Sequence, residues 1–215
     1  DLPRWGADVM MSGTMSILEA AKEAKVKRLV YISSSMVYGD FTQDIGEEDP
    51  CNPIGQYGIM KLAGEQLVKD YARRGCFDYT IIRPSAVYGP RDIEDRVVSK
   101  FLIAAMRDDV LKVKGANEML DFTFVSDAAD GIVAASLDDA GANQTFNITR
   151  SASHTLLEAA QMAIDLVGKG RIEVQDKDAE YPSRASLKIG KARELLGYIP
   201  SVDMEQGFKI GRAHV

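Results

Sequence analysis

The ten residues VKRLVYISSS, at positions 26–35, decide the fold class of this 215-residue chain. Their apolar part, Leu29 to Ile32, is continuous rather than alternating, which is typical of a strand buried on both faces of a parallel sheet. The run DYTIIRP, at 78–84, predicts a second strand of the same kind, halted by its proline. Segments with helical spacing around 9–24 and 55–74 alternate with these runs. This order predicts right-handed crossovers and a doubly wound, Rossmann-like α/β fold on a parallel sheet.

Beyond Gly89 the alternation loosens. The spacing predicts, in chain order, a helix at 95–106, strands at 110–113 and 121–125, a helix from Asp127 to 137, a strand at 144–149, a helix at 154–168 and a short helix within 189–200. Together they predict a smaller mixed α/β lobe over the carboxyl ends of the main strands, where α/β folds bind ligands. The last residues, IGRAHV at 210–215, read like translated sequencing adapter, and we expect them to be a non-native tail.

The composition argues against several classes of function. A formal net charge of −6 disfavours nucleic acid or an anionic membrane as the main partner. No apolar run approaches the roughly 20 residues that span a bilayer, and no signal peptide is visible. Cys51 and Cys76 lie far apart without a Cys-x-x-Cys pattern, which favours reduced thiols in the cytoplasm. With His154 and His214 as the only histidines, we expect no histidine-based metal site.

Tyr57 and Lys61 stand four residues apart in YGIMKLAGEQL, so a helix places both side chains on one face. An ammonium beside a phenol stabilises the phenolate, which makes a tyrosine usable as a general acid or base. When the pair is judged alone, a core tyrosine next to a solvated lysine explains it at least as well.

Three serines, Ser33 to Ser35, fall where the first predicted strand ends, the usual position of catalytic groups in such sheets. One of these hydroxyls can hydrogen-bond a substrate oxygen, although serine clusters also form turns and helix caps. The tripeptide VYG occurs at 37–39 and again at 87–89, each time just after a predicted strand. We expect these two loops to be walls of one pocket.

These residues resemble the extended short-chain dehydrogenase/reductases, grouped as the NAD-dependent epimerase/dehydratase family. The resemblance extends to about residue 209 and is carried by GTMSILEAAKEAKVKRLVYISSSMVYG, QYGIMKLAGEQL, IIRPSAVYGPRD, DFTFVSDAADGI, TFNIT and KARELLGYIP. It implies that 1–90 is the C-terminal part of a Rossmann-like NAD-binding domain and that 91–209 is mainly a substrate-binding lobe with returning Rossmann elements. The family's glycine-rich phosphate loop is not found, and its place precedes Asp1. We therefore expect an N-terminal truncation and an inactive fragment.

The resemblance also implies a role for each matching residue. Tyr57 would be the catalytic acid/base, Lys61 would bind the nicotinamide ribose, and Ser34 would polarise the substrate carbonyl. The implied cofactor-binding residues are Ser33, Tyr57, Lys61, Pro84, Ser85 and Val87. The implied substrate-binding residues are Ser35, Met36, Ala86, Arg91 and Arg184. No metal is implied.

Departures from the family pattern bear on the reaction. Ser35 and Met36 stand where sugar-nucleotide dehydratases carry an acidic pair, which disfavours elimination. Ala86 replaces an asparagine common in nucleotide-sugar enzymes, and Leu120 replaces an arginine that often grips the diphosphate. Arg184, at about the expected distance before KARELLGY, is the best remaining anion contact, with a solvated surface arginine as the alternative.

The residues and the resemblance together predict an NAD-dependent sugar-nucleotide epimerase-like enzyme, which abstracts a hydride at a hydroxyl-bearing carbon and returns it. One alternative is an NAD(P)-dependent dehydrogenase or reductase of a sugar or small hydroxy-carbonyl compound. Another, of a different class, is a non-catalytic dinucleotide-binding sensor or scaffold. NADP stays open beside NAD as the cofactor. The expected partners are a nucleotide sugar and a second copy of the chain, in a cytoplasmic homodimer formed through the helices around 9–24 and 55–74.

Overall fold

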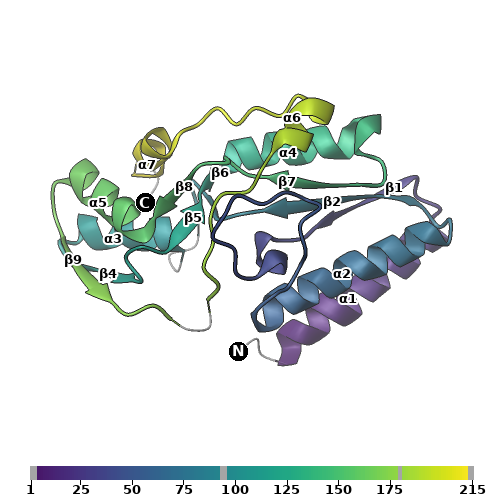
Figure 1. Ribbon diagram of the computed structural model, residues 1–215, viewed down its shortest axis with the longest axis horizontal. Coiled ribbons are helices and arrows are strands. Elements are labelled where there is room, and N and C mark those ends of the chain that lie inside the picture. Colours follow the sequence, from purple (N-terminus) through teal and green to yellow (C-terminus); the bar gives the residue numbers. More distant parts are fainter. Residues whose placement is uncertain (1–3, 93–95, 179–180, 213–215) are drawn as a thin grey trace.

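The computed structural model describes residues 4–92, 96–178 and 181–212. Its main layer is a parallel sheet of three strands in the order β1 (Arg28–Ile32), β2 (Asp78–Pro84) and β7 (Gln144–Ile148). One face is covered by α1 (Arg4–Glu23) and α2 (Gly55–Arg73), and the other by α4 (Val125–Leu137) and α6 (Gly190–Leu196) (Figure 1). The predicted α/β fold, with a parallel sheet between two helical layers, is confirmed.

The burial of the strands follows their place in the sheet. In the central strand β2, Ile81 and Ile82 are fully buried, as the continuous apolar run predicts. In β1 the side chains of Leu29 and Val30 are only half-buried, and Ile32 is 39% exposed. The prediction of full burial is wrong for β1 because, among the described residues, this strand pairs with β2 alone and forms an edge of the sheet.

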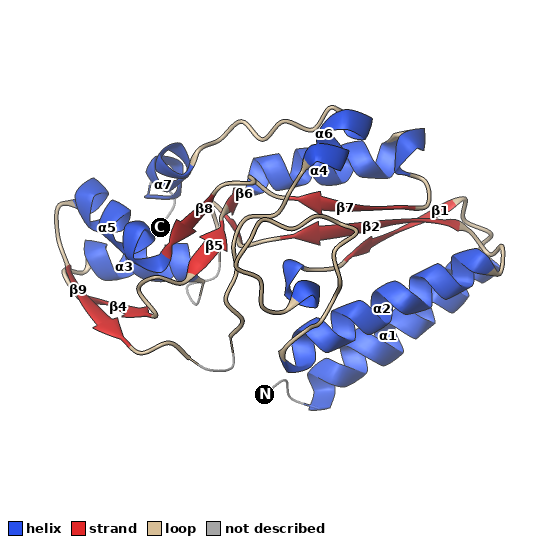
Figure 2. Ribbon diagram, in the orientation of Figure 1, coloured by secondary structure: helices blue, strands red, loops and turns tan. Residues whose placement is uncertain are grey.

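The rest of the chain forms a smaller lobe with parallel and antiparallel strand pairs (Figure 2). Its helices are α3 (Val97–Met106), α5 (Leu156–Val167) and α7 (Met204–Arg212). Its parallel pairs are β4 (Val110–Lys114) with β9 (Arg171–Gln175) and β3 (Val87–Tyr88) with β6 (Thr123–Phe124), and its antiparallel pair is β5 (Met119–Asp121) with β8 (Ser153–Thr155). The core of this lobe is built largely from aromatic and small side chains, among them Phe101, Phe122, Phe124, Phe208, Ala159 and Ala163. Two short 3₁₀ helices, η1 (Ser35–Tyr38) and η2 (Asp139–Gly141), lie in connecting loops.

Asp127 differs from its predicted role. The sequence predicts it as the residue that starts α4, but this helix begins at Val125. The Asp127 carboxylate instead accepts hydrogen bonds from the backbone N–H groups of Ser201 (3.0 Å) and Val202 (2.9 Å). It therefore ties the segment after α6 to α4, and a partner so far along the chain leaves no local signal in the sequence.

Other boundaries differ more modestly. The strand predicted at 121–125 is divided into β5 and β6, and Asp121, the last residue of β5, is buried. Strand β9 is not predicted at all, because its sequence RIEVQ is short and mostly exposed. Helix α7 extends into the segment expected to be a non-native tail, whose residues 213–215 lie outside the described part of the chain, as does Asp95 at the predicted start of α3.

Candidate active site

Tyr57 and Lys61 lie in the first two turns of α2, beside the carboxyl end of β1. The Lys61 ammonium donates a hydrogen bond to the backbone carbonyl of Ile32 (2.8 Å) and lies 5.8 Å from the centroid of the Tyr57 ring. The two side chains thus share one helical face, as their spacing predicts. Tyr57 is 40% exposed, so it is open to a ligand, whereas burial lowers the pKa of Lys61.

Ser34 lies at the start of the loop that follows β1. Its hydroxyl caps η1 by accepting a hydrogen bond from the N–H of Met36 (3.2 Å). Gly58 allows α2 to approach this loop closely, because a Cβ at that position would lie 2.6 Å from the carbonyl oxygen of Met36. The loop that carries Ser34 is therefore packed against the helical turn that carries Tyr57.

A buried polar network lies beneath this loop. The Ser33 hydroxyl donates to a carboxylate oxygen of Glu65 (2.5 Å), and Arg83 forms two hydrogen bonds with the same carboxylate (2.9 and 2.7 Å). Arg83 also donates to the Tyr38 hydroxyl (2.9 Å), which in turn donates to the side-chain oxygen of Asn147 (2.8 Å). Burial raises the pKa of Tyr38 to about 12, so its hydroxyl stays protonated and able to donate. The network joins the loop after β1 to α2, β2 and β7.

Sequence reasoning missed this network, although one signal was available. Arg83 lies inside the apolar run DYTIIRP, and a charged residue in a buried strand requires a counter-ion. Glu65 follows Lys61 by four residues and therefore lies on the same face of α2. Its side chain is fully buried, and that of Arg83 is 3% exposed.

The predicted cofactor-binding residues after β2 lie next to this loop. Pro84 ends β2, Ser85 is buried, and Val87 begins β3. Because Ile32 pairs with Ile82 in the parallel ladder, the loops after β1 and β2 leave neighbouring strand ends. The structure therefore brings these positions close to the end of β1, where the Lys61 ammonium is hydrogen-bonded to the Ile32 carbonyl.

The tyrosines of the two VYG loops occupy different environments. Tyr38 belongs to the polar network, whereas Tyr88 packs against Phe122, Phe124 and Phe208 in the core of the smaller lobe. The Tyr88 hydroxyl has no hydrogen-bond partner among the described residues. The motif therefore repeats in the sequence without placing the two tyrosine side chains in one pocket.

The predicted substrate-binding residues near the main sheet differ in exposure. Ser35 is buried and Met36 is half-buried in η1, while Ala86 is half-buried with a φ of +36°. Arg91 is exposed, and residues 93–95 shortly after it lie outside the described part of the chain.

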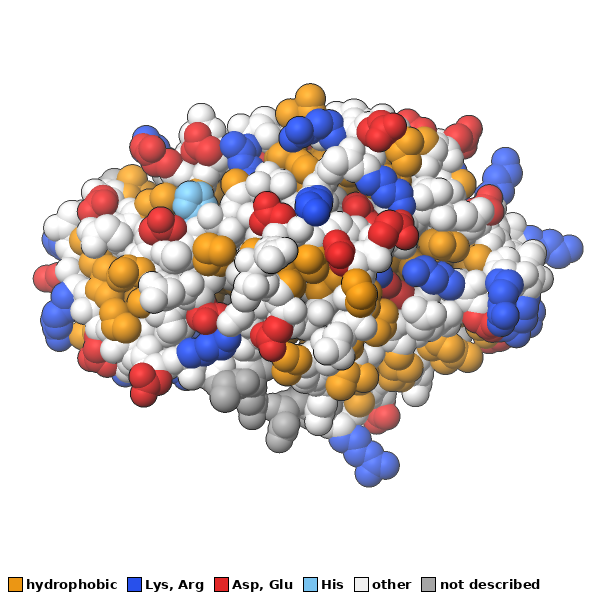
Figure 3. All heavy atoms as spheres, in the orientation of Figure 1, with side chains coloured by type: hydrophobic (Ala, Val, Ile, Leu, Met, Phe, Trp, Pro, Cys, Tyr) orange, Lys and Arg blue, Asp and Glu red, His pale blue; other side chains and the backbone are white. Residues whose placement is uncertain are grey.

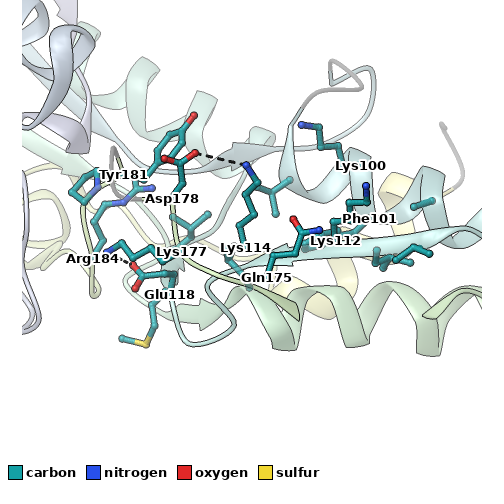
Figure 4. A pocket seen from close by; sticks show the side chains of 18 residues that line it. Lys100, Phe101, Lys112, Lys114, Glu118, Gln175, Lys177, Asp178, Tyr181 and Arg184 are labelled. Atoms are coloured by element: carbon teal, nitrogen blue, oxygen red, sulfur yellow. Dashed lines mark ion pairs between the residues drawn. The ribbon is translucent and has the colours of Figure 1, made fainter. Parts of the chain in front are cut away.

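Arg184 points into a cavity of about 620 Å³ in the smaller lobe (Figure 4). The charged residues of its wall are Lys100, Lys112, Lys114, Glu118, Lys177, Asp178 and Arg184. Two ion pairs form between residues of this wall, Lys177 with Glu118 (3.1 Å) and Lys114 with Asp178 (3.7 Å). The Nε of Arg184 is buried and has no hydrogen-bond partner among the described residues, so this arginine is not a solvated surface residue. Five of the seven charged side chains are basic, which suits an anionic ligand.

Hydrogen bonds join one segment of the cavity wall to the loop after β1. The backbone N–H of Ser183 donates to the Asp40 carboxylate (2.7 Å), and its carbonyl accepts from the N–H of Phe41 (2.9 Å). The segment that carries Arg184 is thus hydrogen-bonded to the residues directly after η1. The sequence singles out Arg184 but not the lysines that line the same cavity, because no local pattern distinguishes them from surface lysines.

Comparisons with known proteins show the family and the fold of the chain. The model of the NAD dependent epimerase/dehydratase family matches residues 6–149. The uncharacterized UDP-glucose epimerase YtcB of Bacillus subtilis is 30% identical over 193 residues, which make up 89% of this chain and 61% of that protein. UDP-glucuronic acid decarboxylase 3 of Arabidopsis thaliana is 32% identical over 208 residues, covering 92% of this chain and 60% of the relative. The chain therefore spans about three fifths of the length of these two curated relatives.

Solved structures show the same fold. UDP-glucuronic acid 4-epimerase from Bacillus cereus, in complex with UDP-glucuronic acid and NAD, superposes with a TM-score of 0.91 at 27% identity, covering 95% of this chain and 66% of that one. UDP-glucose 4-epimerase from Thermotoga maritima, with UDP-glucose, gives a TM-score of 0.92 at 25% identity, with coverages of 99% and 71%. Because the family model matches well over half of its residues, the chain belongs to the NAD dependent epimerase/dehydratase family.

Proposed function

We propose that this chain is part of an NAD-dependent nucleotide-sugar epimerase. The observation that carries the proposal is the packing of the Ser34 loop, through Gly58, against the helical turn that bears Tyr57 and Lys61. A scaffold that only binds a dinucleotide needs no such combination of a phenol, an ammonium and a hydroxyl at one strand end. The close relatives whose names specify epimerases support the same conclusion.

The residues present suit NAD. Lys61 and the exposed Tyr57 offer an ammonium and a phenol at the carboxyl end of β1, which fit the hydroxyl groups of a ribose. The loop with Pro84, Ser85 and Val87 is proposed to border the nicotinamide. When bound, NAD supplies a reversible acceptor for a hydride.

In the proposed reaction the chain's own residues handle the proton and the substrate oxygen. Tyr57 takes the proton from the substrate hydroxyl and gives it back after the sugar has presented its other face. Lys61 stabilises the phenolate by its charge. Ser34 donates its hydroxyl hydrogen to the substrate oxygen and keeps its hydrogen bond from the Met36 N–H, because a hydroxyl can accept and donate at once.

We propose that the cavity around Arg184 binds the phosphates of the nucleotide sugar. Within the chain, residues 1–90 would then supply the cofactor-binding elements and 91–209 mainly the substrate lobe, while β7, α4 and α6 return to the main sheet. The unpartnered Nε of Arg184 supports this assignment, since a buried donor without an acceptor is costly unless a ligand satisfies it.

The change Arg184→Met tests the phosphate site. We expect it to raise the KM for UDP-glucose about tenfold or more, because a lost hydrogen bond between charged groups costs roughly 1.5–3 kcal/mol. The value of kcat should change much less, since Arg184 is remote from the reacting carbon in this scheme. Arg193→Met, which removes an exposed arginine of α6, is the matched control. Equal KM values for the two variants would contradict the assignment.

A homodimer through α1 and α2 is also part of the proposal. Hydrophobic side chains gather over these helices at the lower right of Figure 3, and the exposed ones include Trp5, Val9, Ile17 and Ile59. The apolar surface comes mostly from α1, because Val68 and Tyr71 of α2 are buried within the chain. Ile17→Asp is expected to convert a dimer to a monomer in light scattering, while Val133→Asp, on exposed α4 surface, leaves the mass unchanged. A monomeric unmodified protein would contradict the dimer.

The proposal also includes the location of the protein in the cell. None of the helices in the described ranges combines the length and the hydropathy of a bilayer-spanning helix. Cys51 and Cys76 are free thiols, which supports the proposed cytoplasmic location.

The direct test is turnover of nucleotide sugars by the full-length protein. UDP-glucose and UDP-glucuronic acid are incubated with a substoichiometric amount of NAD, and the sugars are followed by NMR. Formation of an epimer without lasting consumption of NAD is expected. Stoichiometric formation of NADH would favour the dehydrogenase, and NAD binding without turnover would favour the scaffold.

A further inference from the structure

The buried network beneath the Ser34 loop points to a role that sequence comparison does not assign. We propose that Ser33 and Glu65 are positioning residues, which fix the loop carrying Ser34 against the helix carrying Tyr57 and Lys61. This inference rests on the proposed function, since it concerns the geometry of that same site. Neither residue is assigned a contact with the reacting atoms in this role.

Ser33 is held by two hydrogen bonds directly before Ser34. Its backbone N–H donates to the carbonyl of Ile82 in β2 (2.7 Å), and its hydroxyl donates to Glu65 (2.5 Å). Its side chain is 2% exposed. The first bond fixes the loop to the sheet, and the second fixes it to α2. The Ser33 hydroxyl hydrogen is therefore already donated to α2. A contact between Ser33 and the cofactor stays a prediction.

Glu65 connects the loop to the catalytic helix. It lies one turn after Lys61 and two turns after Tyr57, so the three side chains project from the same face of α2. A rotation or shift of α2 that moved Tyr57 would also move Glu65 and, through its bond, Ser33. The position of the Ser34 loop relative to the Tyr57 hydroxyl therefore depends on the hydrogen bond between Ser33 and Glu65.

The orientation of the Glu65 carboxylate is itself fixed. Arg83 grips both of its oxygens in a bidentate pair, and also donates to the Tyr38 hydroxyl (2.9 Å) and the backbone carbonyl of Glu47 (3.3 Å). Tyr38 is the last residue of η1. The loop is thus held at Ser33 and again at Tyr38 by the same ion pair.

Stability alone is a weak explanation for this arrangement. Burying an ion pair costs desolvation energy that its attraction often only repays, and apolar side chains of similar volume frequently stabilise a core as well or better. What an apolar pair cannot supply is a direction for the Ser33 hydroxyl. Because misplacing a reacting group by about 1 Å can cost on the order of a hundredfold in rate, a fixed direction matters at this position.

The test is a double-mutant cycle in the full-length protein with UDP-glucose and NAD. Ser33→Ala removes the bond to Glu65 and leaves the Glu65–Arg83 pair intact, so the chain still folds. We expect kcat to fall about tenfold or more while KM stays nearly constant. In a Ser34→Ala background the same change should have little further effect on kcat, because Ser33 acts through Ser34.

Tyr198→Phe is the control for a loss of stability alone. It removes one buried hydroxyl, which donates to the backbone carbonyl of Thr149 (3.2 Å) rather than to a residue of the Ser34 loop, and is expected to lower the melting temperature without changing kcat. If Ser33→Ala behaves like this control, or if its effect multiplies with that of Ser34→Ala, the positioning role is wrong while the proposed function stands. If Ser34→Ala and Tyr57→Phe also leave turnover unchanged, both proposals fail.

Discussion

The change Tyr57→Phe is expected to lower kcat by about 10²- to 10⁴-fold, the contribution typical of a positioned general acid or base. Phenylalanine keeps the ring against which Lys61 lies and removes only the hydroxyl that carries the proton. Cofactor affinity should fall far less than kcat, because the Lys61 ammonium still offers its hydrogen bonds to the ribose, and titration of NAD into the variant measures it alongside initial rates. The loss belongs to kcat rather than KM, because the proton moves only during the chemical step.

Tyr79→Phe provides the matched control for this prediction. Tyr79 lies in β2, packs in the apolar layer under α1 and α2, and has no place in the proposed chemistry. Its loss of a hydroxyl should leave kcat unchanged. Retention of full activity by Tyr57→Phe would remove the catalytic assignment, whatever the outcome for Tyr79.

Arg83→Met is expected to have the largest effect on stability, a loss of about 3–5 kcal/mol in the free energy of unfolding. It leaves the Glu65 carboxylate, which is fully buried, without its bidentate partner. Breaking such a pair costs more than the pair contributes, because the remaining charge stays desolvated. Urea unfolding followed by circular dichroism measures the difference between the variant and the unmodified protein.

Two further variants interpret that result. Arg73→Met removes an exposed partner of Asp70 and should change the free energy of unfolding by about 0.5 kcal/mol or less. The double change Glu65→Met with Arg83→Met should recover most of the stability lost by Arg83→Met alone, because no unpaired charge remains. A single Arg83→Met variant as stable as Arg73→Met would show that the buried pair is unimportant.

The parts of the fold that follow from local patterns are predictable from the sequence. Helix α2 and strand β2 have strong periodicity and clear stop signals, and both lie close to their predicted bounds. The juxtaposition of Tyr57 and Lys61 also follows from helix geometry alone. Ser34 follows from its position at a strand end together with the family resemblance.

The parts that depend on distant partners are not predictable in this way. The sequence places Asp127 at the start of a helix, yet its carboxylate accepts hydrogen bonds from the backbone N–H groups of Ser201 and Val202. The exposure of Ile32 depends on whether another strand pairs with β1, which the residues of β1 do not encode. The place of Arg83 in an apolar run indicates a buried charge. Only the fold shows that Glu65 is its ion-pair partner and that the same carboxylate accepts a hydrogen bond from Ser33.

The most direct measurement of the central claim follows a labelled hydride through the reaction. The full-length protein is given UDP-glucose with deuterium at carbon 4 and a substoichiometric amount of NAD, and the products are analysed by NMR and mass spectrometry. Abstraction and return of the hydride at that carbon predicts an epimer that keeps its deuterium at carbon 4, with no accumulation of NADH. Deuterium that appears in a growing pool of NADH, or a sugar that stays unchanged while NAD is bound, would contradict the account.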